Sequence, residues 1–264
     1  KVGLSVFLRI GPFVHGEVRN GGFPDWIIQR EKEGMAIRCN NKEYLDYVRR
    51  FWKKVYEQVD GCMEKDGGPV IGIQIENEYG HVGGLQGPEG EAHIRTLTAI
   101  AKEIGFDVPL YTATGWGGAC IGDLLPVMGG YCEAPWDQRT CEIEPNANFV
   151  FSHTRNDALI ACDHHVENAN SYNEEDFPFL TAELGGGLQV TMHRRPVAKG
   201  CDVGAMSTVK MGSGAGLLGY YMYHGGSNPK GKLSTLQESR ATGYLNDLPE
   251  INYDFNAPIR QYGT

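Results

Sequence analysis

The chain has 264 residues, of which 41% are hydrophobic and 22% charged, and its formal net charge at pH 7 is −9. This composition is typical of an ordinary globular protein with one large core. The negative charge argues against nucleic acid, anionic membrane surfaces and polyanionic substrates, because these ligands normally recruit a Lys/Arg-rich face. A neutral substrate fits better, and no apolar run reaches the length of a membrane span.

Strands and helices are predicted to alternate along the chain, which favours βα units and a parallel sheet in a single domain over residues 1–264. Residues 18–26 form a Gly-rich loop between the first strand and the first helix. The apolar patterns predict strands at residues 2–10, 70–76, 109–112, 127–130, 177–183 and 216–223. Helices are expected at residues 42–65, with Asn40 or Asn41 as the N-cap, at 89–104, within 148–169 and at 203–211. Six strands approach a (β/α)8 TIM barrel but fall two short.

The strand at residues 70–76 carries unusually many polar groups at its end. It runs into Gln74-Ile75-Glu76-Asn77-Glu78-Tyr79. A side-chain period of two would put Gln74, Glu76 and Glu78 on one face, unless the pleat relaxes at the strand end. Buried polar groups need a partner or a ligand, so this strand end predicts the rim of an active site; a structural carboxylate network is the alternative.

Glu183 ends another apolar strand, as Glu78 does. The C-terminal ends of all strands in a βα barrel meet at one mouth, so both glutamates are expected to face the same cavity. Two carboxylates without a metal-ligand pattern match glycoside hydrolysis, in which one protonates the leaving oxygen and the other attacks the anomeric carbon. That chemistry requires no cofactor and no metal.

Four sequence blocks carry a resemblance to glycoside hydrolase family thirty-five, the β-galactosidases, and a fifth, Asp254-Phe255-Asn256-Ala257-Pro258-Ile259, adds to it. They occur in the family's order across nearly the whole chain: Leu8-Arg9-Ile10-Gly11-Pro12-Phe13; Glu17 with Gly21-Gly22-Phe23-Pro24-Asp25-Trp26; Gly67-Gly68-Pro69 through Gln74-Ile75-Glu76-Asn77-Glu78-Tyr79-Gly80; and Tyr221-Met222-Tyr223-His224-Gly225-Gly226-Ser227-Asn228. Members of the family open with two more strands, so the resemblance implies a TIM barrel that is incomplete at its N-terminus. The chain departs from the family pattern at His15-Gly16-Glu17-Val18, where members have Cys-Ala-Glu-Trp.

The resemblance also implies roles for individual residues. Glu78 would be the general acid/base and Glu183 the nucleophile of a retaining mechanism that removes terminal β-D-galactosyl residues, with Asn77 on the sugar 2-hydroxyl. Glu17, with its neighbour Gly16, would bind galactose hydroxyls, and Arg9 would support the nucleophile or the sheet mouth. Aromatic walls for the sugar, each of which could instead be core, are Tyr79, Tyr111 and Trp116. The alternatives are a different β-glycoside as substrate, or a noncatalytic carbohydrate-binding fragment.

Other patterns predict no further chemistry. Gly185-Gly186-Gly187 lacks the ending of a phosphate loop, and Ser207-Thr208-Val209-Lys210 lacks the partner motifs of serine acyl enzymes. The group Asp163-His164-His165 with Glu167 lacks a metal-binding helical spacing. His224, at the end of the last predicted strand, either lines the mouth or is a structural histidine.

Seven cysteines form an odd set without a Cys-x-x-Cys pair. Free thiols are therefore favoured over a disulfide framework, which points weakly to a reducing compartment. A bridge between Cys132 and Cys141 stays open as an alternative.

Overall fold

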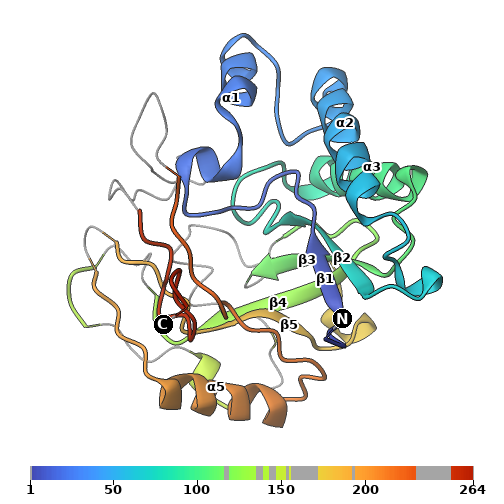
Figure 1. Ribbon diagram of the computed structural model, residues 1–264. Helices are drawn as coiled ribbons and strands as arrows, with labels where there is room; N and C mark the ends of the chain where they lie inside the picture. The colour runs from blue at the N-terminus through green and yellow to red at the C-terminus, as the bar shows by residue number, and fades with distance from the viewer. Residues whose placement is uncertain are drawn as a thin grey trace.

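The computed structural model describes residues 2–115, 119–134, 139–142, 147–152, 155, 172–191, 194–229 and 251–263. Its centre is a five-stranded sheet in the order β1-β2-β3-β4-β5, in which every neighbouring pair is parallel (Figure 1). The strands are β1 Val6–Arg9, β2 Val70–Asn77, β3 Leu110–Gly115, β4 Leu125–Tyr131 and β5 Thr181–Gly185. Strand order equals chain order, so the sheet forms a parallel half-barrel, and the predicted parallel βα arrangement is confirmed to that extent.

The predicted sixth strand is replaced by isolated bridges. Residues beyond β5 run parallel to it and pair only at Leu217 with Leu180 and at Tyr220 with Leu184. The backbone nevertheless pairs along this stretch, because the amides of Thr181 and Leu184 donate to the carbonyl groups of Leu217 and Gly219, and the amides of Gly219 and Tyr221 donate to those of Thr181 and Leu184. The hydroxyl of Thr181 adds further hydrogen bonds to Leu217 and Gly219.

Helices α1 Asp25–Lys32, α2 Lys42–Val59, α3 Gly87–Ile104 and α5 Gly200–Gly212 accompany the strands, with short 3-10 turns at Arg19–Gly22, Glu64–Asp66, Ala147–Phe149 and Glu174–Asp176. Asn41 is the N-cap of α2, since its side chain accepts from the Tyr44 amide at 3.1 Å. The helix ends at Val59, six residues before the predicted end, where Gly61 adopts a φ of 72°. Helix α1 lies partly in the predicted Gly-rich loop and was not anticipated.

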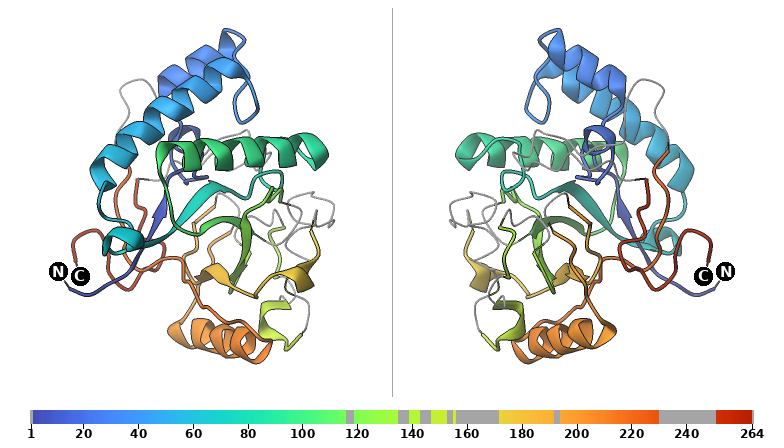
Figure 2. Two further views of the ribbon diagram at one scale, coloured as in Figure 1. Left: turned by 90° about the vertical axis from the view of Figure 1, so that its right-hand side faces the viewer. Right: turned by 90° about the vertical axis from the view of Figure 1, so that its left-hand side faces the viewer.

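The main apolar core lies between the sheet and helices α2 and α3. Trp52 of α2 is fully buried, and its indole N–H donates to the Ile10 carbonyl at 2.8 Å. Val48 of α2 and Leu97 of α3 belong to the same cluster as Ile73 and Ile75 of β2. These two helices lie together over one side of the sheet, whereas α5 lies at the opposite end of the molecule (Figure 2). Packing against α2 and α3 therefore holds β1 and β2 in place.

Several predictions fall outside the described residues. The helix expected within 148–169 is described only at the 3-10 turn Ala147–Phe149, and Trp116 and the group at Asp163 lie outside the described ranges. Six cysteines within those ranges are free, Cys132 and Cys141 included, so the proposed bridge between these two is absent. No helix in the described part of the chain is both long and apolar enough to cross a membrane.

Candidate active site

The ends of β1 and β2 bring a guanidinium and two amides together. Nη2 of Arg9 donates to Oδ1 of Asn77 at 2.8 Å, and Nε2 of Gln74 donates to the same oxygen at 2.9 Å. Asn77 is almost fully buried. With Oδ1 occupied by two donors, the amide is oriented so that its Nδ2 group remains the donor for a ligand.

The backbone at the end of β2 leaves the regular pleat. Glu76 and Glu78 have φ values of 57° and 47°, in the left-handed region that favours glycine. The expectation that Gln74, Glu76 and Glu78 share one face is therefore wrong for Glu76. Gln74 joins Asn77 and Arg9, whereas the carboxylate of Glu76 pairs with Arg38, which precedes α2.

The pair of Glu76 and Arg38 is a structural support behind the site. Nη2 of Arg38 lies 3.0 Å from Oε2 of Glu76. The Arg38 side chain is 5% exposed and the Glu76 side chain is 0% exposed. Burial raises the pKa of Glu76 although the attraction of Arg38 opposes the shift. Arg38 also lies over the Phe13 ring at 4.1 Å and donates to the Val82 carbonyl at 2.8 Å. This network ties the loop after β1 to the loop after β2.

Glu183, in β5, is held by two donors. Nη2 of Arg9 donates to its Oε1 at 2.9 Å, and the hydroxyl of Tyr131, at the end of β4, donates to its Oε2 at 3.0 Å. The side chain is 12% exposed. The two donors fix the orientation of the carboxyl group, as a nucleophile requires. The predicted contact between Arg9 and Glu183 is present.

Glu78 is also largely buried, with 6% of its side chain exposed, and Nδ1 of His15 lies 3.4 Å from its Oε2. Burial lowers the pKa of His15, but the hydrogen bond and charge of Glu78 and the charge of Glu17 outweigh burial, so the net shift is upward. An imidazolium beside Glu78 is therefore favoured at mildly acidic pH.

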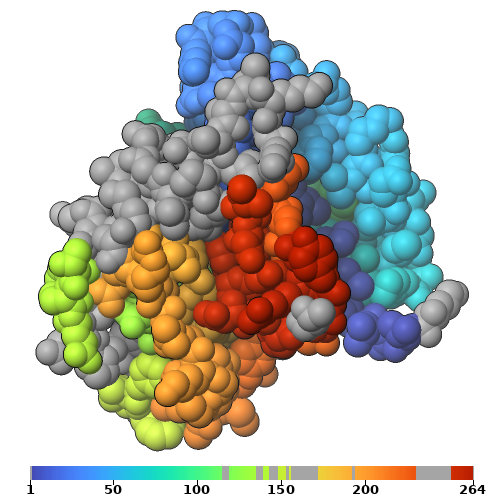
Figure 3. Space-filling view, turned by 60° about the vertical axis from the view of Figure 1, so that its left-hand side comes forward, coloured from blue at the N-terminus to red at the C-terminus, as the bar shows by residue number. Residues whose placement is uncertain are grey.

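Glu17 is surrounded by groups from the far end of the sequence. The hydroxyl groups of Tyr253 and Tyr221 both donate to Oε2 of Glu17, the latter at 3.4 Å. Nδ2 of Asn228 donates to the Glu17 carbonyl at 2.9 Å. Burial raises the pKa of Glu17. In Figure 3 the segment 251–263 lies against residues 194–229 on one face of the molecule.

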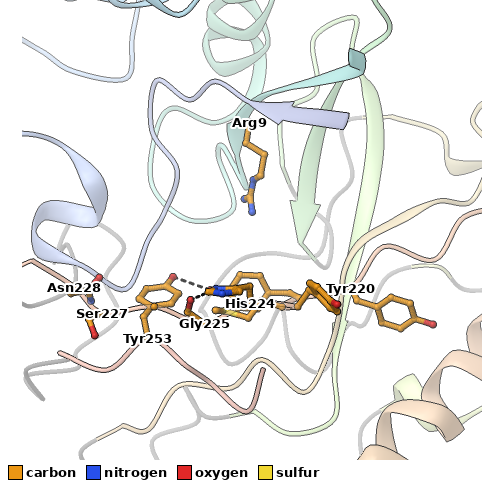
Figure 4. A pocket seen from close by; sticks show the side chains of 11 residues that line it. Arg9, Tyr220, His224, Gly225, Ser227, Asn228 and Tyr253 are labelled. Atoms are coloured by element: carbon orange, nitrogen blue, oxygen red, sulfur yellow. Dashed lines mark hydrogen bonds between the residues drawn. The ribbon is translucent and has the colours of Figure 1, made fainter. Parts of the chain in front are cut away.

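Three carboxylates lie around the Tyr131 hydroxyl. Its pKa is raised well above its ordinary value, first by burial and then by the negative charges of Glu183, Glu78 and Glu17. A nearby hollow of about 520 Å³ is lined by His224, by Arg9, which binds Glu183, and by Tyr221 and Tyr253, which bind Glu17, but by none of the three glutamates. Figure 4 shows Arg9 pointing from β1 toward the wall formed by Tyr253 and His224. His224 thus lines the mouth.

Two of the proposed aromatic walls have other surroundings. Tyr79 is fully buried and its hydroxyl donates to the Arg38 carbonyl at 2.6 Å, so neither face of its ring is open to a sugar. Tyr111 packs edge-to-face on Phe7, with ring centroids 6.0 Å apart, and lines a separate hollow of about 370 Å³. Gly16 stands next to Glu17, and its amide donates to the Gly21 carbonyl at 3.2 Å.

Four functional side chains were missed by the sequence reasoning: His15, Tyr131, Tyr221 and Tyr253. Tyr131 could have been found, because it ends a strand of the same sheet as Glu183. Tyr221 lies within the apolar run at residues 216–223 that predicts a sixth strand, and it opens one of the sequence blocks quoted above. Tyr253 has no periodic signal of its own and is identified only by the hydrogen bonds that it makes across the fold.

A parallel half-barrel in which Glu78 follows β2 and Glu183 lies in β5, with an arginine and a tyrosine on Glu183, matches the class of βα-barrel glycosidases. The family model of glycosyl hydrolases family 35 matches residues 1–264, and the chain belongs to that family.

Curated relatives agree with this assignment. The chain is 28% identical to β-galactosidase 17 of Arabidopsis thaliana over 272 aligned residues, and 29% identical to β-galactosidase 6 of Oryza sativa subsp. japonica over 266. The alignments cover 100% and 99% of this chain but only 34% and 25% of those two proteins. The chain therefore spans about a quarter to a third of the length of the curated relatives that it matches.

Proposed function

We propose that this chain carries the catalytic residues of a retaining β-galactosidase, which releases terminal β-D-galactosyl residues from oligosaccharides or glycoconjugates. The observation that carries the proposal is the grouping of Glu78, Glu183 and Glu17 around the Tyr131 hydroxyl, which together with Arg9 holds Glu183. We also propose that the five-stranded half-barrel is one part of a (β/α)8 barrel.

The proposed reaction proceeds in two displacements. Glu183 attacks the anomeric carbon while Glu78 gives its proton to the leaving oxygen, so the glycosidic bond breaks and a glycosyl ester of Glu183 forms. Glu78, now a carboxylate, then takes a proton from water while the water oxygen attacks the anomeric carbon, which breaks that carbon's bond to Glu183 and releases the sugar and the Glu183 carboxylate. Arg9 and Tyr131 hold Glu183 through both steps by donating to its two oxygens.

Sugar recognition follows from the remaining donors and acceptors. Nδ2 of Asn77 is available to the 2-hydroxyl, because Oδ1 already accepts from Arg9 and Gln74. Glu17 accepts hydrogen bonds from galactose hydroxyls, since a carboxylate oxygen has room for more than one donor. These groups suit an uncharged ligand, which agrees with the expectation of a neutral substrate.

Hydrolysis of chromogenic β-galactoside and β-glucoside by the purified protein tests this proposal. We expect faster hydrolysis of the galactoside, and a loss of roughly 10⁴-fold or more in kcat for Glu183→Gln. Glu57→Gln is the matched control, since Glu57 forms a surface pair with Lys54. Absence of turnover on both glycosides would refute the catalytic role. Faster hydrolysis of the glucoside would show that the substrate is a β-glucoside and not a β-galactoside. An inverted product configuration by NMR would refute the double displacement.

A further inference from the structure

His15 lies next to the proposed acid/base, Glu78, but has no role in the reaction proposed above. It lies in the loop between β1 and the 3-10 turn at Arg19–Gly22, with a φ of 48°. Its Nδ1 atom is 3.4 Å from Oε2 of Glu78, and 20% of its side chain is exposed. A non-glycine residue in the left-handed region has a conformational cost, and here that conformation places an imidazole beside the proposed acid/base.

The imidazole is held in place from behind. Phe13 stacks on it with ring centroids 6.1 Å apart and planes 18° apart, and Phe13 in turn lies under the Arg38 guanidinium. Phe13 is buried in the main core. The position of His15 is thus determined by the same support that fixes the end of β2.

Three cations each lie next to a different carboxylate. Arg9 binds Glu183 and Arg38 binds Glu76, whereas His15 lies next to Glu78. The charged groups that face His15 are Glu76 and Glu78 from the end of β2, Glu17 from its own loop and Arg38 from the segment before α2. Burial and Arg38 disfavour the imidazolium, the carboxylates favour it, and the net effect raises the pKa of His15.

We propose that His15 is a positioning residue for Glu78: its Nδ1–H group holds one carboxyl oxygen of Glu78 so that the other exchanges the proton with the leaving group and with water. The inference rests on the proposed acid/base role of Glu78. No proton is consumed, because the proton that Glu78 gives up in the first displacement is recovered from water in the second.

Leaving-group dependence separates this role from sugar binding. A 2,4-dinitrophenolate departs without protonation, so 2,4-dinitrophenyl β-galactoside does not need a well-placed acid in the first displacement. Lactose has a sugar alkoxide as its leaving group and does need one. A group that positions Glu78 affects kcat/KM for lactose, whereas a group that binds the galactose or supports the fold affects both substrates equally.

Two substitutions of His15 are compatible with its left-handed backbone conformation, and they differ in whether they keep a hydrogen-bond donor next to Glu78. His15→Gly removes the donor, and we expect kcat/KM for lactose to fall about 10- to 100-fold while that for the dinitrophenyl substrate changes by less than about threefold. His15→Asn places an amide N–H near the position of Nδ1 and should recover a large part of the loss. Equal losses on both substrates, or no loss on lactose, would overturn the positioning role.

A titration by NMR tests the contact without any turnover. Glu78→Gln removes the charge opposite His15, so the pKa of the His15 imidazole should fall; Glu57→Gln should leave it unchanged. His93 is an internal control, because burial lowers its pKa to about 4 independently of Glu78. An unchanged His15 titration in Glu78→Gln would refute the pairing. If the parent hydrolyses no galactoside but this shift is seen, the proposed function fails while the contact stands.

Discussion

The two halves of the molecule are held together in different ways. In what we call the layered half, residues 2–124, one continuous apolar cluster joins β1 and β2 to α2 and α3. In the bridged half, the described part of residues 125–263, the second buried cluster contains only Tyr131, Ala134 and Leu188. The layered half supplies Glu78, and the bridged half supplies Glu183. Glu183 is therefore held by one hydrogen bond from each half, from Arg9 of the layered half and from Tyr131 of the bridged half, whereas Glu78 and its neighbour His15 both belong to the layered half.

The largest effect should come from breaking the buried ion pair of the layered half. Glu76→Gln leaves the Arg38 guanidinium buried without a counter-charge, so we expect the free energy of unfolding to fall by about 3 kcal/mol. Urea denaturation measures this loss. Glu103→Gln, which breaks a surface pair with Arg49, should cost less than about 1 kcal/mol. Similar losses of unfolding free energy in the two variants would contradict the distinction between a buried and a surface ion pair.

Breaking the link between the halves should reduce activity more than stability. Arg9→Gln removes the charge-assisted bonds to Glu183 and Asn77, and we expect kcat/KM to fall about 10- to 100-fold. The free energy of unfolding should change little, because the Arg9 side chain is 38% exposed. Steady-state kinetics and urea denaturation on the same preparations measure both, with Arg95→Gln as the surface control. An unchanged kcat/KM would mean that Arg9 does not support the nucleophile.

Removal of a single neutral donor should have a smaller effect. Tyr131→Phe deletes the hydroxyl that donates to Oε2 of Glu183 and leaves the ring in place, so we expect kcat to fall about 5- to 10-fold. Tyr56→Phe is the control, since that ring packs on Phe106 away from the site. A loss no larger than that of the control would show that the Arg9 contact alone holds Glu183.

The smallest effect should be a gain in stability. Burial raises the pKa of Glu17 above its ordinary value of 4.5, so the folded state loses free energy relative to the unfolded chain as the pH rises above 4.5, and the loss is complete above the folded pKa. Glu17→Gln removes that cost, and we expect a gain of up to about 1 kcal/mol at pH 7 that disappears below about pH 4.5. Thermal unfolding at several pH values measures it. A loss of stability at pH 7 would show that the tyrosine hydrogen bonds outweigh burial.

The sequence predicted the layered half well because its elements have local signals. Asn41 before an amphipathic run predicted the start of α2, and the β-branched run at residues 70–76 predicted β2. In the bridged half the patterns also predicted β4, β5 and α5, although with shifted bounds. Residues 216–223 pair with β5 through backbone hydrogen bonds but form only isolated bridges, a difference in pairing that the apolar pattern does not encode.

The candidate site was predictable only in part for a similar reason. Glu78 and Glu183 stand out because each follows an apolar strand, and Arg9 because it ends another. The reversal of Glu76 toward Arg38 depends on two left-handed residues, Glu76 and Glu78, which no helix or strand periodicity encodes. The approach of His15 to Glu78 has the same origin, in a φ of 48° within a loop.

The hydrogen-bond partners of Glu17 indicate the order in which parts of this protein fold. Its amide and carboxylate contact Tyr253, which lies 236 residues further along the chain. Domains are synthesised from the N-terminus, and distant contacts form late because long loops must close first. The Arg38 support and the end of β2 can form early, whereas Glu17 acquires its tyrosine partners only after almost all of this chain has left the ribosome. Under the proposed function, sugar recognition through Glu17 therefore requires that Tyr221 and Tyr253 have already been synthesised and have docked.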